Sequence, residues 1–250
     1  MARTTIELRI KRQDSPTGSP RWEEFSLPYR PKQNVISCLM EIRKNPVTKD
    51  GTKTTPVAWD SACLEEVCGS CTMLVNGKPC QSCSALIDRL PEGTVTLEPL
   101  TKFPVVRDLQ VDRGRMFDAL KKVRAWIPID GTYDLGPGPK LDEDARERAY
   151  HFAQCMTCGC CMEACPQFGF RSDFLGPAPI AQVRLFNAHP TGRMNARERL
   201  DAIMGHGGLT ECGNAQNCVE VCPKQIPLTE AFGELGRQTA IAWLQSLLGK

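Results

Sequence analysis

Two cysteine-rich runs in the second half of the chain constrain the fold more than any other feature of the sequence. The first run ends at Pro166 and follows C-x2-C-x2-C-x3-C-P, and its cysteines are Cys155, Cys158, Cys161 and Cys165. This spacing is typical of iron–sulfur ligation, in which three thiolates hold one cluster and the fourth reaches a second cluster. The N-terminus carries no apolar leader segment, so a reducing compartment is expected, where thiols bind metals rather than form disulfides.

The second run repeats this pattern with one cysteine missing. Its cysteines are Cys212, Cys218 and Cys222, and Ala215 stands at the middle position. A methyl group cannot ligate iron, so the two clusters are expected to differ. The shared fourth ligands predict a [4Fe–4S] cluster on Cys155, Cys158, Cys161 and Cys222, and a [3Fe–4S] cluster on Cys165, Cys212 and Cys218. The alternative is a second [4Fe–4S] cluster with water or hydroxide on its fourth iron.

A third motif lies near the N-terminus. Cys63, Cys68 and Cys71 have the C-x4-C-x2-C spacing of plant-type [2Fe–2S] sites. The small residues Gly69 and Ser70 allow the backbone to wrap closely, so that N–H groups can point at the sulfurs. The motif therefore predicts a third cluster, separate from the two of the C-terminal half.

The fourth ligand of this third site is expected on the strand that returns from a turn at Asn76-Gly77. A strand over 72–75 leads into this turn, and both Cys80 and Cys83 follow it. Cys83 is favoured, because it lies farther beyond the turn and begins an apolar segment. Cys80 is then interpreted as a spare thiol.

Hydrophobic periodicity predicts a β-rich N-terminal part and a helical C-terminal part, and hence an α+β fold. Strands are expected over 4–12, 25–29, 72–75 and 93–98, with a helix capped by Asn34 after the second strand. Helices are expected over 116–123, 142–153, 180–186 and 200–204 and from residue 228 onward, with a loop over 130–140. The composition changes near residue 103, so the predicted domains are 1–104 and 105–250.

Composition excludes several classes of function. The 250 residues carry 31 basic and 29 acidic side chains, and the two signs are mixed along the chain. This charge pattern disfavours a nucleic-acid partner. No apolar run approaches the roughly 20 residues that a transmembrane helix needs. Neither a Rossmann glycine fingerprint nor a P-loop is found, so flavin or nicotinamide is expected on another chain. Three clusters on one chain predict a carrier of single electrons.

These motifs resemble, along nearly the whole chain, the iron–sulfur subunit of succinate dehydrogenase and fumarate reductase, the family of respiratory complex II. The resemblance rests on Cys63-x4-Cys68-Gly-Ser-Cys71 with a cysteine at x11, Cys155 to Pro166, and Cys212-x5-Cys218-x3-Cys222-Pro223. The family spacing selects Cys83 over Cys80 and implies a [3Fe–4S] cluster beside Ala215. It also implies a plant-ferredoxin-like β-grasp domain followed by a helical bacterial-ferredoxin-like domain.

The resemblance implies electron transfer from FAD on a partner flavoprotein, through [2Fe–2S], [4Fe–4S] and [3Fe–4S] clusters, to quinone at a membrane-anchor cytochrome b subunit. The chain would have no catalytic residue of its own, since the dicarboxylate site lies on a partner chain. It would lie peripherally on the cytoplasmic face of the inner (plasma) membrane, held there by partner subunits. The alternatives are a fumarate reductase subunit working in the reverse direction and a soluble multi-cluster ferredoxin-like carrier.

The family places quinone near the three-iron cluster. Pro166 matches the family, whereas Gly169 and Phe170 stand where a Trp pair is usual, and Gly213 stands where a His often follows the cysteine. His206 is a further candidate, six residues before the last cysteine run. The expected quinone vicinity is therefore Pro166, Phe170, Gly213 and His206.

Two segments resemble the menaquinone-using bacterial form, which pairs with a single di-haem cytochrome b subunit. These segments are 64–67 and 187–192. The expected partners therefore include haem b on the anchor subunit and menaquinone as the acceptor.

Five other residues receive structural interpretations. Cys38 is expected to be an inert buried thiol, and Cys160 to pack near the clusters without ligating them. Glu163 is expected to face solvent. Trp126 and Trp243 are expected in the core or at a partner contact.

Overall fold

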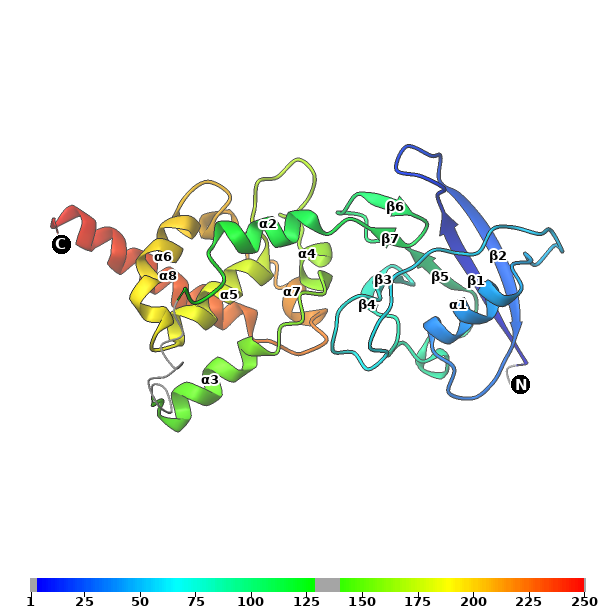
Figure 1. The fold of residues 1–250 in the computed structure, drawn as a ribbon, viewed down its shortest axis with the longest axis horizontal. Helices are drawn as coiled ribbons and strands as arrows, with labels where there is room; N and C mark the ends of the chain where they lie inside the picture. The colour runs from blue at the N-terminus through cyan, green and yellow to red at the C-terminus, as the bar shows by residue number, and fades with distance from the viewer. Residues whose placement is uncertain (1–3, 129–139, 250) are drawn as a thin grey trace. The chain divides into compact units, whose positions relative to one another are not determined.

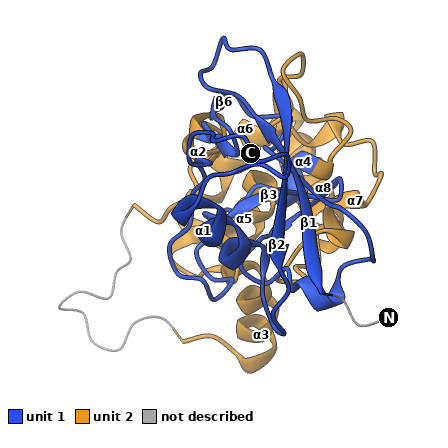
Figure 2. Cartoon of the chain, turned by 90° about the vertical axis from the view of Figure 1, so that its right-hand side faces the viewer, with its two compact units in different colours: residues 1–113, 156–163 blue, residues 114–155, 164–250 orange. Residues whose placement is uncertain are grey.

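The computed structural model describes residues 4–128 and 140–249. The chain forms two compact units, coloured separately in Figure 2. Unit 1 comprises Met1–Arg113 and Met156–Glu163, and unit 2 comprises Gly114–Cys155 and Ala164–Lys250. The domain boundary at residue 104 stays a prediction, and most of the loop expected over 130–140 lies outside the described residues.

Unit 1 is built on a five-stranded sheet in the order β2-β1-β5-β3-β4. The strands are β1 Thr5–Arg12, β2 Arg21–Pro28, β3 Thr72–Val75, β4 Lys78–Gln81 and β5 Val95–Glu98. β1 pairs antiparallel with β2 and parallel with β5, which places Leu8 beside Phe25 and Val95. A second small sheet joins β6 Val105–Arg107 to β7 Gln110–Val111, and a short 3-10 helix, η1, spans Ile87–Arg89.

The core of unit 1 lies between this sheet and helix α1, Val35–Lys44, which packs beside β2 (Figure 1). The alternating residues Ile6, Leu8 and Ile10 of β1 are fully buried, as the sequence predicts. Leu39 of α1 is buried in the same cluster. The predicted strands and helix of this part of the chain are therefore confirmed.

Helix α1 begins at a capping box that also reaches a candidate ligand. The Asn34 side chain accepts a hydrogen bond from the Ser37 N–H at 2.8 Å, and the Ser37 hydroxyl accepts from the Asn34 N–H at 3.0 Å. The Asn34 amide nitrogen donates to the Cys83 carbonyl at 2.9 Å. The start of the helix thus fixes the backbone at Cys83.

Arg12 continues the inward face of β1 and is fully buried with a charged partner. Its Nε donates to Asp108 Oδ1 at 2.9 Å, and neither side chain is exposed. Asp108 also accepts from the backbone N–H groups of Gln13 and Ala58, at 3.1 and 2.8 Å. Because the buried carboxylate and guanidinium satisfy each other, the segment that leads to Cys63 is held against the sheet.

Unit 2 is helical, and α5 lies at its centre, in contact with α2, α3, α6 and α8 (Figure 1). Its helices are α2 Gly114–Lys122, α3 Glu143–Ala153, α5 Pro177–Ala188, α6 Ala196–Met204, α7 Asn217–Glu220 and α8 Leu228–Leu247, with 3-10 turns η2 Gly192–Asn195 and η3 Leu209–Glu211. The short helix α4, Cys160–Ala164, begins in unit 1 and ends in unit 2. The predicted helices are confirmed, and so is the α+β class.

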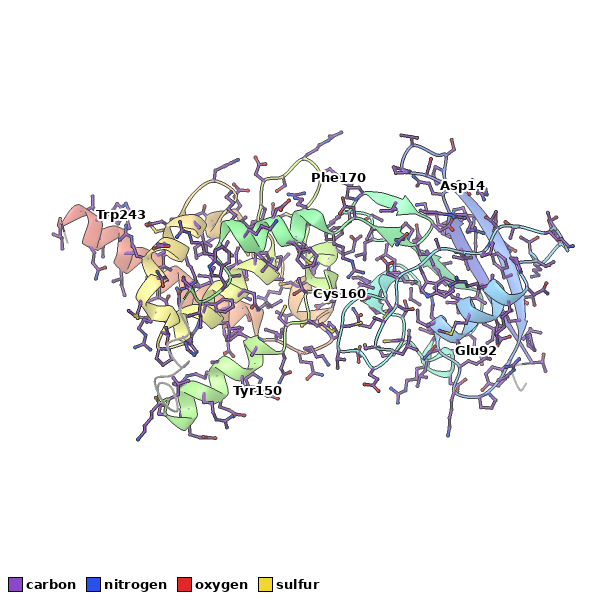
Figure 3. All side chains as sticks on the ribbon, viewed as in Figure 1. Asp14, Glu92, Tyr150, Cys160, Phe170 and Trp243 are labelled. Atoms are coloured by element: carbon purple, nitrogen blue, oxygen red, sulfur yellow. The ribbon has the colours of Figure 1, made fainter. Side chains whose placement is uncertain are left out.

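Helix α3 is less buried than the spacing of its apolar residues suggests. Of Ala145, Ala149, Phe152 and Ala153, only Phe152 is buried, and Ala153 is exposed. The contact of α3 with α5 includes a hydrogen bond from the Gln182 side chain to the Phe152 carbonyl. Trp126 and Trp243 are both exposed, so neither lies in the core of the unit, and a partner contact stays a prediction for both. Trp243 is labelled on α8 in Figure 3.

Candidate iron–sulfur sites

The plant-type loop directs backbone N–H groups at its cysteine sulfurs. Cys63 Sγ accepts from the N–H groups of Glu65 and Val67, at 3.3 and 3.4 Å. Cys68 Sγ accepts from the Ser70 N–H at 3.5 Å. Donors of this kind stabilise a thiolate, which is the form of cysteine that ligates metal. The predicted N–H orientation is confirmed at these two sulfurs.

The backbone reaches this geometry through left-handed residues. Leu64, Glu66 and Gly69 have φ values of 61°, 56° and 72°. Alternation of such residues with ordinary ones turns successive N–H groups toward a common centre, which forms an anion-binding concavity. The loop is thus shaped for a negatively charged group.

Two of the four candidate ligands, Cys68 and Cys71, lie in opposite environments. Hydrogen bonds from Ser70, together with Cys63, lower the pKa of Cys68 to about 6. Burial raises the pKa of Cys71 to about 12, and the Cys83 thiol lies beside it. A cation at this position would reverse the second effect, since iron favours the deprotonated thiol. The donor set fits a cluster that takes four thiolates.

Cys80 lies on β4, three residues before Cys83. It is partly buried against the hydrophobic core, and this burial raises its pKa to about 11. Cys83 is buried and adjoins Cys71, which accords with the prediction of Cys83 as the fourth ligand. The assignment itself stays a prediction.

Arg113 and Gly69 hold the plant-type loop in place. Arg113 donates through Nη1 and Nη2 to the carbonyl oxygens of Gly69 and Ser70, each at 2.6 Å. A Cβ atom added at Gly69 would lie 2.8 Å from the Met156 carbonyl oxygen and 2.9 Å from Cys158 Cα. Only glycine therefore allows this loop to contact the backbone of Met156–Glu163, the part of the first ferredoxin-type run that belongs to the same unit.

The two ferredoxin-type runs share one backbone conformation. The left-handed residues fall at equivalent places and have φ values of 53° at Thr157, 91° at Gly159, 53° at Asn214 and 62° at Gln216. A short helix follows each pair, α4 in the first run and α7 in the second. Ala215 thus occupies the place that Cys158 has in the first run, on an equivalent stretch of backbone.

In unit 2, three cysteines gather around one cavity. Cys165, Cys212 and Cys218 line it together with Ala215. Burial and the nearby sulfurs of Cys165 and Cys212 raise the pKa of Cys218 to about 11. Three thiolates would repel one another here without a cation, so the residues fit an iron-containing group that takes three ligands.

The four cysteines predicted for the [4Fe–4S] cluster are divided between the units. Cys158 and Cys161 lie in unit 1, and Cys155 and Cys222 lie in unit 2. Cys222 Sγ accepts from the Ile226 N–H at 3.4 Å, another backbone donor aimed at a sulfur. The grouping of these four cysteines stays a prediction.

Among residues 4–128 and 140–249, no three His, Cys, Asp or Glu side chains are arranged to hold a single metal ion. Cluster ligands need not converge in that way, because no more than two of the thiolates contact any one iron.

Glu163 corrects one prediction. It does not face solvent but is buried, with 7% of its surface exposed. Its carboxylate accepts from the N–H groups of Thr101 and Lys102, at 2.9 and 3.1 Å, and from the Thr101 hydroxyl. A buried carboxylate requires such donors, and these come from a segment far away in the sequence.

The residues expected near quinone separate into two groups. Pro166 and Gly213 line the three-cysteine cavity. Phe170 is 65% exposed and lies on a loop outside that lining (Figure 3). His206 is also exposed, and its ring nitrogens lie 2.8 Å from Asp173 and 3.3 Å from Glu211. A quinone contact stays a prediction for all four residues.

Two family models match the chain in sequence order. A 2Fe-2S iron-sulfur cluster binding domain matches residues 7–118, and a 4Fe-4S dicluster domain matches residues 151–226. Together with the shaped cysteine loops, these matches define the chain as a multi-cluster iron–sulfur electron-transfer protein.

Known proteins narrow this class. The chain is 62% identical to the succinate dehydrogenase iron-sulfur subunit of Bacillus subtilis, over 98% of this chain and 96% of the relative. It is 27% identical to the fumarate reductase iron-sulfur subunit of Wolinella succinogenes, over 93% and 96%. The chain belongs to the family of succinate dehydrogenase and fumarate reductase iron–sulfur subunits, as its motifs predict.

A solved structure supports the fold. A chain of the Mycobacterium smegmatis Sdh1 complex in the apo form matches with a TM-score of 0.77 and 24% identity, over 96% of this chain and 97% of that one. In the part of the chain that is described, none of the helices has the length and apolar character needed to cross a bilayer.

Proposed function

We propose that the chain conducts electrons within a membrane-bound succinate:quinone oxidoreductase, from FAD on a partner flavoprotein to quinone at a membrane-anchor subunit. The clusters supply one-electron storage, and the protein positions them and tunes their potentials. The proposed ligands are Cys63, Cys68, Cys71 and Cys83 for [2Fe–2S], Cys155, Cys158, Cys161 and Cys222 for [4Fe–4S], and Cys165, Cys212 and Cys218 for [3Fe–4S].

The observation that carries this proposal is the repeated loop with alanine in place of cysteine. Because Ala215 has the backbone setting of Cys158 but no sulfur, the two ferredoxin-type sites are unequal. The site with fewer thiolates bears less negative charge, which favours its reduction. The three-cysteine cavity is therefore the proposed exit for electrons, and Pro166 and Gly213 in its lining are the proposed neighbours of quinone.

Succinate oxidation is favoured over fumarate reduction as the working direction. The identity to a succinate dehydrogenase subunit is 62%, whereas the fumarate reductase subunit of Wolinella succinogenes reaches 27%. Assays of the intact complex in both directions, with menaquinone and menaquinol analogues, test this choice. Faster fumarate reduction than succinate oxidation at matched substrate levels would contradict it.

Purification from detergent-solubilised membranes tests the assembly. We expect a flavoprotein and a haem-bearing membrane subunit to copurify, with about nine irons per chain as the total of the three clusters. Electron paramagnetic resonance (EPR) of the oxidised complex should show a three-iron signal. A chain that purifies alone, or with only two clusters, would refute the proposal.

Ala215→Cys tests the unequal sites directly. The backbone around Ala215 matches that of Cys158, so the new thiol needs no rearrangement to reach the site. We expect the three-iron signal to disappear, about one iron per chain to be gained, and the potential to fall. Ala215→Val, similar in size but without a ligand atom, should keep the three-iron signal. A signal that persists in Ala215→Cys would refute the assignment of Ala215.

A further inference from the structure

Gln81, at the end of β4, joins two cysteines that belong to different motifs. Its Oε1 lies 3.5 Å from Cys71 Sγ, and its Nε2 lies 3.7 Å from Cys160 Sγ. Nε2 also donates to the Thr72 hydroxyl at 2.7 Å. The side chains of Gln81, Cys71 and Cys160 are almost completely buried, and all belong to unit 1.

A buried amide must satisfy both its oxygen and its nitrogen. The partners available to Gln81 are two sulfurs and one hydroxyl, and Thr72 in turn donates to the Gly69 carbonyl at 2.8 Å. The amide therefore connects the plant-type loop to the turn that carries Cys160. Neither Gln81 nor Cys160 has a role in the proposed ligand set, so this buried contact needs its own explanation.

Ligation of iron changes what the amide faces. Cys71 loses its proton when it binds iron, so its sulfur can accept a hydrogen bond but cannot donate one. An amide oxygen and nitrogen are nearly equal in size, and their placement follows the hydrogen bonds available. With the two atoms exchanged, Nε2 donates to Cys71 Sγ, while Oε1 accepts from the Thr72 hydroxyl. The Thr72 proton then leaves the Gly69 carbonyl, which keeps its hydrogen bond from Arg113 Nη1 at 2.6 Å. The Cys160 thiol, which is hydrogen-bonded to Cys158, donates to Oε1 when it turns toward the amide. None of these changes moves the backbone.

We propose that Gln81 donates a hydrogen bond to the Cys71 thiolate and thereby sets the reduction potential of the [2Fe–2S] cluster, with Cys160 as the positioning residue that orients the amide. This inference rests on the proposed ligand set. Hydrogen bonds to cluster sulfurs are among the factors that set the potential. A donor stabilises the more negative, reduced state more strongly, so its loss lowers the potential.

Redox titration of the plant-type EPR signal in the intact complex tests this role. Gln81→Met keeps the length of the side chain and removes both amide groups. We expect it to shift the one-electron equilibrium about three- to tenfold toward the oxidised cluster, where tenfold corresponds to about 59 mV. Cys160→Ala should shift it in the same direction by less, and Cys160→Ser, which keeps a donor, should restore most of the potential.

Two further variants sharpen the test. Gln81→Met combined with Cys160→Ala should shift the potential no more than Gln81→Met alone, because Cys160 acts through the amide. Cys80→Ser is the matched control. Cys80 precedes Gln81 in β4, so its side chain points to the opposite face of the strand, and the potential should not change.

The outcomes separate this inference from the proposed function. A wild-type complex without a plant-type signal refutes the ligand set itself, and this inference with it. A normal signal whose potential is the same in wild type, Gln81→Met and Cys160→Ala refutes only the role of Gln81. If Gln81→Met fails to assemble, the comparison of Cys160→Ala with Cys160→Ser decides, and equal potentials in these two variants overturn the inference.

Discussion

Removal of the Glu163 carboxylate should loosen unit 1 at the first ferredoxin-type run. In Glu163→Ala the backbone N–H groups of Thr101 and Lys102 lose their acceptor at a buried site. Each stranded donor costs about 1–3 kcal/mol, so the local opening free energy should fall by about 2–6 kcal/mol. Water that enters the space left by the carboxylate can accept from both N–H groups. The fall in the local opening free energy should therefore lie at the lower end of this range. Because Cys161 lies two residues away, iron should also be lost more readily.

Hydrogen exchange followed by mass spectrometry measures this effect at the two amides concerned. The repeat supplies a matched control, since Glu220 stands in the second run where Glu163 stands in the first, and it is exposed. Glu220→Ala should leave exchange at Thr101 and Lys102 unchanged, and Glu163→Gln, which keeps one acceptor oxygen, should give an intermediate value. Equal exchange rates in Glu163→Ala and Glu220→Ala would refute the reasoning.

Two more perturbations have definite expected results. Gly69 and Gly77 both have left-handed φ values, of 72° and 76°, so alanine costs about 1–2 kcal/mol at either. Only at Gly69 does the new Cβ overlap the Met156 carbonyl, so Gly69→Ala should lower the melting temperature more and weaken the plant-type signal. Arg237 lowers the pKa of Glu234 to about 2, and Arg237→Ala should return it toward 4.5, as carbon-13 NMR titration can show. The Glu234–Arg237 pair stabilises the fold fully above pH 4.5, and this stabilisation disappears as the pH falls through about 2. A stability difference between wild type and Arg237→Ala that persisted below pH 2 would contradict this assignment.

Sequence reasoning succeeded where the partners of a residue lie close to it along the chain. The donors to Cys63 Sγ come from two and four residues further on, so the cysteine spacing and small neighbouring residues were enough to predict them. The starts of the helices at Asn34 and Asp142 are local in the same way, since each cap bonds to a residue three positions later. The second ferredoxin-type run could also be predicted from the sequence, because the spacing of its cysteines repeats that of the first run.

Where the partner is remote, the same reasoning failed or had nothing to say. Glu163 was expected to face solvent, and its partners lie 61 and 62 residues earlier in the sequence. The contact of Gln81 with Cys160 spans 79 residues, and no local pattern marks Gln81 as special. The sequence around Glu163, between Cys161 and Cys165, does not indicate which distant backbone N–H groups lack an acceptor. Such pairs depend on how unit 1 brings its segments together.

The return of Met156–Glu163 to unit 1 has a consequence for biosynthesis. A ribosome adds about 5–20 residues per second, so the roughly fifty residues after Arg113 take about 3–10 s to appear. During that interval the nascent unit 1 has its sheet and its plant-type loop but lacks the segment that contacts Gly69, Gln81 and Thr101. The plant-type loop is therefore synthesised in full seconds before the segment that packs against it, so its first contacts along the chain are those within residues 1–113.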